Sequence, residues 1–205
     1  MGRGEEIDLA GDAQRRLSVL FEEARACTRC PSMEGHPRIL GPECGVATAR
    51  CLVLGEAPGW QGAAQTGVPL HGDRAGETFE RLLEDAGIRR EDVFVSNAVL
   101  CVPRDPSGEA RAPAKREIAS CTHFVRSLID LLDPALVVTL GGSALASTDI
   151  VAPHGLSLRW DAGEVHRWFG RFLLPLYHPG ARTPSHRPWA KQREDYALWA
   201  SLLYG

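Results

Sequence analysis

The chain has 205 residues, of which 44% are hydrophobic and 24% charged, and a formal net charge of −3. This composition is that of a folded domain and excludes a disordered chain or a fibre. No apolar run reaches the roughly 20 residues that cross a bilayer, and the N-terminus lacks the apolar core of a secretory signal. We therefore expect one domain over residues 13–205, a loosely ordered segment over residues 1–12, no membrane partner and a cytoplasmic location.

Hydrophobic periodicity divides the chain into alternating helices and strands. Apolar residues at helical spacing predict amphipathic helices, and short apolar runs bounded by glycine, proline or polar residues predict buried strands. The expected helices cover residues 13–26, 114–132 and 189–204, and two further helices are expected to start at residues 77 and 141. The expected strands cover residues 51–54, 93–99, 136–140 and 172–177. A loop and hairpin are expected at residues 153–163, before the last of these strands. This alternation predicts an α/β protein whose parallel sheet is covered on both faces.

A glycine-rich loop follows the first expected strand. The stretch CLVLGEAPGWQGAAQTGVPLHGDRAG, residues 51–76, begins as a strand and continues with repeated glycines. Loops of this kind at the carboxyl end of a strand bind ligands in α/β proteins, and glycines let the backbone approach a ligand closely. It is not a P-loop, because no Gly-Lys-Ser/Thr closes it. It carries two acids, Glu56 and Asp73. For Asp73 the structural alternative to a role in the site is the N-cap of the next helix.

Polar or glycine residues occupy the ends of all four expected strands. Glu56 follows the first strand, Asn97 lies in the second, Gly141 and Gly142 follow the third, and His178 follows the fourth. Because the carboxyl ends of parallel strands share one edge of a sheet, an acid, an amide and a histidine should converge there. Each has a structural alternative, namely a loop cap for Glu56, a turn or cap for Asn97 and a hydrogen-bonded core histidine for His178.

Six cysteines in a chain without an export signal indicate metal ligands or buried thiols rather than disulfides. The Cys-x-x-Cys pair at Cys27 and Cys30 is the firm element. Two ligand sets include this pair: Cys27, Cys30, Cys44 and Cys51 for a zinc ribbon, or Cys27, Cys30, Cys101 and Cys121 for an iron–sulfur cluster. Cys51 begins an apolar strand, which favours a buried thiol over a ligand. Spacing alone leaves zinc, a cluster and no metal open.

Several motifs occur in order: GEAPG at 55–59, TGVPLHGDRAG at 66–76, SNAVLC at 96–101 and YHPG at 177–180. Together they resemble the uracil-DNA glycosylase superfamily, most closely its iron–sulfur families 4 and 5, from about residue 27 to the C-terminus. The chain is intermediate between these families, since it keeps Glu56 of family 4 and a Gly72-Asp73 pair more like family 5. The resemblance implies a three-layer α/β/α fold with a four-stranded parallel sheet. It also implies a [4Fe–4S] cluster held by Cys27, Cys30, Cys101 and Cys121.

The resemblance further implies a chemistry for the strand ends. Such enzymes rotate a base out of the duplex and break its N-glycosidic bond, leaving an anionic base and a sugar with oxocarbenium character. His178 is then the donor to uracil O2, and Asn97 reads the O4 and N3–H edge, whose pattern cytosine reverses. The backbone around Glu56 and Ala57 would complete the base pocket.

Three points stay open within this resemblance. Leu70 occupies the position where the family usually stacks a phenylalanine on the base, so the preferred lesion is not defined. The residue that activates water is Glu56 or Asp73, unless catalysis depends on stabilising the anion more than on a base, as relatives in family 5 suggest. No lysine lies at the strand ends, so we expect a monofunctional enzyme. A glycosylase for hypoxanthine or xanthine, and a non-catalytic iron–sulfur DNA-binding or redox-sensing module, are the alternative functions.

The resemblance places a DNA-contacting loop after His178. The residues expected to touch DNA there are Arg182, Thr183, His186 and Arg187, and a second phosphate contact is expected from Arg104, Arg111 and Lys115. A solvated entrance to the last helix would explain the same basic run. We expect the protein to be a monomer whose partner is DNA containing deaminated bases.

Overall fold

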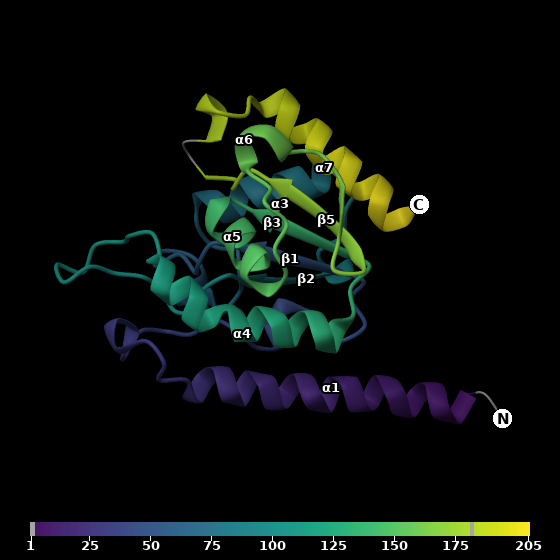
Figure 1. Ribbon diagram of the computed structural model, residues 1–205, viewed down its shortest axis with the longest axis horizontal. Helices are drawn as coiled ribbons and strands as arrows, with labels where there is room; N and C mark the ends of the chain where they lie inside the picture. Colours follow the sequence, from purple (N-terminus) through teal and green to yellow (C-terminus); the bar gives the residue numbers. More distant parts are fainter. Residues whose placement is uncertain (1–2, 181–182) are drawn as a thin grey trace.

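The computed structural model describes residues 3–180 and 183–205, and a five-stranded sheet lies at its centre (Figure 1). The strands are β1 (Cys51–Gly55), β2 (Val93–Asn97), β3 (Leu136–Leu140), β4 (His166–Trp168) and β5 (Arg171–Leu176), in the spatial order β2-β1-β3-β5-β4. The four strands expected from the sequence are β1, β2, β3 and β5, and they pair in parallel with one another. The predicted parallel sheet is therefore confirmed.

The strand β4 corrects the expected count of four strands. It pairs antiparallel with β5 across a two-residue turn at Phe169 and Gly170. Both turn residues have positive φ, 47° and 76°, as a type I′ hairpin turn requires. The hairpin thus lies at residues 166–176, later than the expected 153–163. A strand of three residues is too short for an alternating pattern to reveal it.

The described residues form seven α-helices, arranged as two layers around the sheet. They are α1 (Arg3–Ala26), α2 (Ala63–Thr66), α3 (Arg74–Ala86), α4 (Lys115–Leu132), α5 (Gly142–Val151), α6 (Leu158–Asp161) and α7 (Trp189–Tyr204), with short 3-10 turns η1 (Pro31–Met33), η2 (Pro42–Cys44), η3 (Arg90–Asp92) and η4 (Thr183–Ser185). Helices α3 and α7 pack together on one face, α4 and α5 pack together on the other, and α1 lies outside α4 (Figure 1). The expected three-layer α/β/α architecture is confirmed.

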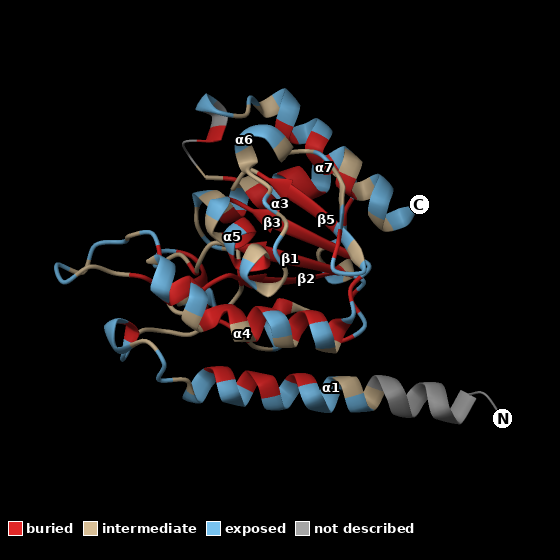
Figure 2. Cartoon of the chain, viewed as in Figure 1, coloured by how far each residue is buried: buried red, intermediate tan, exposed pale blue. Residues whose placement is uncertain are grey.

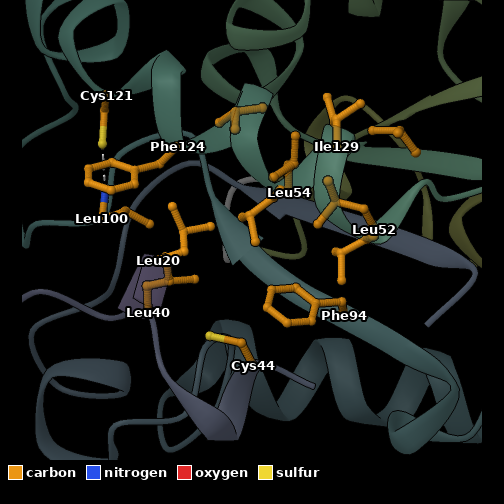
Figure 3. Packing of buried hydrophobic residues seen from close by; sticks show 14 of the residues in the cluster. Leu20, Leu40, Cys44, Leu52, Leu54, Phe94, Leu100, Cys121, Phe124 and Ile129 are labelled. Atoms are coloured by element: carbon orange, nitrogen blue, oxygen red, sulfur yellow. Dashed lines mark hydrogen bonds between the residues drawn. The ribbon is translucent and has the colours of Figure 1, made fainter. Parts of the chain in front are cut away.

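Side chains of the strands alternate between two apolar clusters, and the strands are buried along most of their length (Figure 2). Leu52, Leu54 and Phe94 pack toward α1 and α4, as the close view in Figure 3 shows. Val53 and Val95, which point the other way, pack with apolar side chains of α3 and α7. This period-2 alternation means that each strand residue near the carboxyl edge has a defined side of the sheet.

The first helix is longer than expected. It begins at Arg3, whereas the sequence pattern indicated a start at residue 13. The predicted buried face is confirmed, and its members are Leu17, Leu20, Phe21 and Ala24. None of the helices in the described part of the chain combines the length and hydrophobicity that crossing a bilayer requires.

Candidate active site and cysteine pocket

The carboxyl ends of the parallel strands meet at a point where the direction of winding reverses. After β1 the chain continues to β2 on one side, and after β3 it continues to β4 and β5 on the other side. Gly55 at the end of β1 is paired with Asn97 at the end of β2, and Leu140 at the end of β3 is paired with Leu176 of β5. Ligands of open α/β sheets bind at such a switch point. The residues beyond these strand ends therefore define the candidate active site.

Asn97 presents a buried amide with an unused donor. Only 2% of the residue is exposed, and a Cβ added to Gly55 would lie 2.5 Å from its Oδ1, so glycine at position 55 leaves the amide its room. Its Nδ2 has no hydrogen-bond partner in the part of the chain that the structure describes. An unsatisfied buried donor costs about 1–3 kcal/mol. This cost is understandable if the amide serves an external ligand.

His178 is held at the strand edge by its own main chain. Its carbonyl oxygen accepts hydrogen bonds from the backbone N–H of Gly180, at 2.8 Å, and from the hydroxyl of Thr183. Its Cβ lies against Gly141, and a Cβ added to Gly180 would approach its Nδ1 to 3.2 Å. Burial lowers the pKa of the imidazole, and the negative charges of Glu56 and Asp73 oppose this effect. The ring is therefore neutral at pH 7 and has one N–H to donate.

The two acids of the glycine-rich loop are held by different partners. The hydroxyl of Ser143, in the first turn of α5, donates to Glu56 Oε2 at 2.6 Å. Asp73 is the N-cap of α3, because its Oδ1 accepts from the backbone N–H of Gly76 at 2.9 Å. The cap expected for Asp73 is thus present, but its Oδ2 faces the backbone of the preceding glycines rather than the helix. Both carboxylates are close enough to His178 to act on its charge.

Ala57 and Leu70 belong to the backbone that surrounds these acids. The turn that contains Glu56 and Ala57 is tied to the end of β2, because Ala98 N donates to Gly55 O at 2.8 Å and Val99 N donates to Glu56 O at 3.1 Å. Leu70 is half-buried, packs against the core on the α3 side and has a left-handed φ of 50°. Its expected contact with a base stays a prediction.

The loop after His178 uses its expected DNA-contacting residues in several ways. Arg182 lies outside the described residues. Thr183 is buried and its hydroxyl is bonded to His178. Arg187 forms an ion pair with Asp195, which is only 5% exposed, and the phosphate contact expected for Arg187 stays a prediction. His186 is exposed and stacks on Tyr177 with an interplanar angle of 10°.

Four of the six cysteines line one pocket between α1, α4 and the end of β2. They are Cys27, Cys30, Cys101 and Cys121. Cys121 is buried and its sulfur accepts from the backbone N–H of Leu100 at 3.4 Å (Figure 3). Cys44 packs into the core near Phe94 (Figure 3), and Cys51 is fully buried on the opposite side of the sheet. The structure therefore brings together the second cysteine set and separates the zinc-ribbon set.

Four thiols and a guanidinium group with a buried Nε line this pocket. Among the described residues, no three histidine, cysteine or acidic side chains converge as ligands of one ion would. In a [4Fe–4S] cluster each thiolate binds a different iron, so the sulfurs surround the group instead. Arg38 also lines the pocket, and its Nε is buried without a partner in the described part of the protein. An unpaired cationic donor beside thiols suits an anionic cluster.

A saturated polar network supports this pocket. Glu117 in α4 is 1% exposed and accepts two hydrogen bonds from Arg111, each 2.7 Å long. It also accepts from the hydroxyl of Ser32 and from the backbone N–H of Ala114, again at 2.7 Å. The guanidinium of Arg111 lowers the pKa of Glu117 to about 2. The guanidinium of Arg111 thus binds Glu117, and the phosphate contact expected for Arg111 stays a prediction.

Sequence reasoning missed Ser143, Glu117 and Arg38. Ser143 directly follows the Gly141-Gly142 pair at a strand end, which was an available signal. Glu117 occupies the position three residues after Ala114, where a capping glutamate is common. Nothing in the local sequence around Arg38 indicates that it reaches a cysteine pocket.

The fold and this edge define an α/β protein with a ligand site at the switch point and a separate cysteine pocket. Residues 42–201 match the family model of the Uracil DNA glycosylase superfamily. This match covers more than half of the chain, and the chain belongs to that superfamily.

Individual relatives agree with the family match. A Type-4 uracil-DNA glycosylase of Thermotoga maritima is 34% identical over 164 residues, which cover 80% of this chain and 81% of the relative. A Type-4 uracil-DNA glycosylase of Pyrobaculum aerophilum is 30% identical over 89% of this chain and 92% of the relative. A Type-5 uracil-DNA glycosylase of Thermus thermophilus is 32% identical over 67% of each chain. Relatives of both types match, which confirms the resemblance inferred from the motifs.

Proposed function

We propose that the protein is a monofunctional uracil-DNA glycosylase that rotates uracil out of DNA and hydrolyses its N-glycosidic bond, the first step of base excision repair. The observation that carries this proposal is the buried Asn97 amide, whose Nδ2 has no partner among the described residues, at the same sheet edge as His178. Membership of the superfamily and the names of the relatives support the same activity. The substrate places the protein with the chromosome, in the cytoplasm, where we expect it to act as a monomer.

Asn97 selects the base in this proposal. Its Nδ2–H donates to uracil O4 and its Oδ1 accepts from N3–H. Cytosine presents an amino donor and an N3 acceptor at these positions, so two favourable contacts become two unfavourable ones. Sites that hydrogen-bond a substrate reject an analogue with the reversed pattern strongly, because buried polar groups are left unpaired. Leu70 contributes an apolar contact to the face of the base.

His178 stabilises the departing base. As the bond between N1 and the sugar C1′ breaks, negative charge moves onto uracil, and a neutral imidazole N–H can donate to O2 without a proton being transferred. One well-placed donor to a developing anion contributes about 3 kcal/mol. The hydroxyl of Thr183 and the N–H of Gly180 hold the main chain of His178 in place for this contact.

Glu56 is the group that we assign to the water. Its Oε2 is held by Ser143, which leaves Oε1 to orient a water molecule toward C1′ and to stabilise the positive charge on the sugar. Asp73 has one oxygen engaged in the α3 cap, and its charge acts on His178 less strongly than that of Glu56. Asp73 is thus assigned to support the loop around the site.

Cys27, Cys30, Cys101 and Cys121 would hold a [4Fe–4S] cluster. When bound, the cluster supplies a covalent cross-link between α1, the β2 end and α4, and hydrolysis of the glycosidic bond requires no electron from it. The apolar lining of the pocket and the unpaired Nε of Arg38 support this assignment. Purified protein should be brown and contain about four irons per chain. A colourless protein with one zinc would contradict the assignment.

A substrate panel tests the function. Duplexes with a single uracil, hypoxanthine or xanthine are incubated with the protein and then treated with alkali, which cleaves at abasic sites. We expect cleavage of the uracil strand only after alkali, because no lysine is available to cleave the strand. Cleavage confined to the purine lesions would favour the alternative glycosylase, and no cleavage of any duplex would favour a non-catalytic module.

A further inference from the structure

A hairpin, residues 102–113, lies between the cysteine pocket and the glycine-rich loop. It starts directly after Cys101 and projects from the body of the molecule (Figure 1). Arg104 and Ala110 form an isolated antiparallel bridge, and Arg111 Nε donates to Arg104 O at 3.0 Å. At its tip, Asp105 Oδ1 accepts from the backbone N–H groups of Ser107 and Glu109, each at 2.9 Å. These bonds give the hairpin an ordered shape.

The base of the hairpin is anchored on the cysteine side. Arg111 binds Glu117, and Glu117 also binds Ser32 in the 3-10 turn after Cys30. Cys101 itself forms an isolated bridge with Arg38, which lines the cysteine pocket. The hairpin is therefore connected to both segments that supply the other cysteines.

The other contact of the hairpin reaches the glycine-rich loop. The guanidinium carbon of Arg104 lies 4.1 Å from the centre of the Trp60 ring. The carbonyl of Trp60 accepts from Gln65 Nε2 at 3.0 Å, so the tryptophan is part of an ordered turn. Trp60 lies between Gly59 and Gly62, and a Cβ at either glycine would collide with Asp73 Oδ2. The backbone that carries Trp60 is thus packed directly on one of the site carboxylates.

We propose that Arg104 is a positioning residue that fixes the glycine-rich loop against the hairpin of residues 102–113. Its partner is Trp60, and the ordered element is the backbone around Asp73. The phosphate contact that the sequence predicted for Arg104 is replaced by this role. The kinetic consequence rests on the proposed glycosylase function, whereas the structural consequence does not.

Hydrogen exchange of the free protein tests the structural consequence. The variants are Arg104→Ala, Arg104→Lys and a matched control, Arg159→Ala. The guanidinium carbon of Arg159 lies 4.8 Å from the ring centre of Trp160, an exposed residue of α6. Arg159→Ala therefore removes the same kind of contact elsewhere in the molecule. A cation–aromatic contact contributes about 0.5–1 kcal/mol at a partly exposed site, which corresponds to a roughly two- to fivefold change in an opening equilibrium.

We expect peptides covering residues 57–66 to exchange two- to fivefold faster in Arg104→Ala, while Arg104→Lys, which keeps a cation over the ring, stays close to the wild type. Arg159→Ala should leave these peptides unchanged. Unchanged exchange in Arg104→Ala would overturn the proposal, whatever the substrate panel shows. Failure of the glycosylase activity would leave this result intact, so the two proposals fail separately.

Single-turnover kinetics separate positioning from DNA contact. With enzyme in saturating excess over uracil-containing duplex, Arg104→Ala should lower the rate roughly two- to fivefold and leave the Kd for an abasic duplex unchanged. If Arg104 instead contacted a phosphate, Arg104→Ala would raise that Kd, lower the salt slope by about 1 and leave the rate at saturation unchanged. That second pattern would contradict the assignment. Trp60→Phe should retain most of the rate, since the ring face is kept.

Discussion

Asn97 and Glu117 are both buried polar residues near the carboxyl edge of the sheet, but their hydrogen bonding is opposite. Glu117 is 1% exposed and accepts four hydrogen bonds, two from Arg111 and one each from Ser32 and the N–H of Ala114. Asn97 is 2% exposed, and its Nδ2 donates to nothing in the described part of the chain. The first pattern belongs to the cysteine pocket and the second to the candidate active site.

This difference indicates that the Glu117 carboxylate stabilises the fold and that the Asn97 amide is available to bind a ligand. A saturated buried carboxylate stabilises the elements that it joins, and removing one partner leaves the others unpaired. An unsatisfied amide costs stability in the free protein and regains that cost when a substrate supplies the acceptor. The glycines of the candidate active site leave room for its own polar side chains, since a Cβ at Gly55 would meet Asn97 Oδ1 and a Cβ at Gly59 or Gly62 would meet Asp73 Oδ2.

The largest effect is expected for His178→Ala. Removing the donor to the departing base should lower the single-turnover rate of uracil excision about 10²–10³-fold, while the free energy of unfolding changes little. His166→Ala provides the control, because this histidine lies in the edge strand β4 and has no role in the proposed site. A wild-type rate for His178→Ala would remove His178 from the active site.

Glu117→Gln should damage the protein differently. The change removes the charge opposite Arg111 and replaces one acceptor oxygen by a donor, so we expect a loss of about 2–3 kcal/mol in the free energy of unfolding. Urea denaturation at pH 7 measures this loss. Glu22→Gln is the matched control, since it breaks an exposed pair with Arg25 and should cost less than about 0.5 kcal/mol. Equal effects of the two variants would contradict the role assigned to the network.

Asn97→Leu tests the unpaired amide. An apolar side chain of similar size removes the unsatisfied donor, so stability should be unchanged or higher by about 1 kcal/mol while uracil excision falls at least roughly tenfold. Ser96→Ala is the neighbouring control, because Ser96 is also fully buried with a hydroxyl that has no partner in the described residues, but it faces the other side of the sheet. That variant should keep its activity. A strong loss of stability in Asn97→Leu would show that the amide is a structural group.

The smallest effect is a pH dependence of stability. The pKa of Glu117 lies at about 2 in the folded protein, below the ordinary value of 4.5, because of its bond to Arg111. Its contribution is therefore fully present above pH 4.5 and is lost as the pH falls toward 2. The difference in stability between wild type and Glu117→Gln should shrink as urea titrations move from pH 6 to pH 3. A constant difference would mean that Glu117 has the same pKa in the folded and in the unfolded protein.

Local patterns predicted the elements and the polar edge. The helix predicted at 189–204 is α7, and the strands predicted from apolar runs are β1, β2, β3 and β5. These patterns succeed because an element with one buried face has apolar residues at a regular spacing along the chain, and this spacing can be read from the local sequence. Once the strands are parallel, Glu56, Asn97 and His178 must share an edge, so the convergence also followed from order along the chain.

The amino-acid sequence by itself thus determined the α/β alternation, the edge that carries the site and the Cys-x-x-Cys pair. Only the tertiary structure decided which other cysteines join that pair, that Arg111 binds Glu117 and Arg187 binds Asp195, and that Arg104 meets Trp60. These choices join segments 6 to 94 residues apart, with Arg111 six residues from Glu117 and Cys27 ninety-four from Cys121. Charged and thiol side chains have many possible partners at such separations, and the packing of helices on the sheet selects among them.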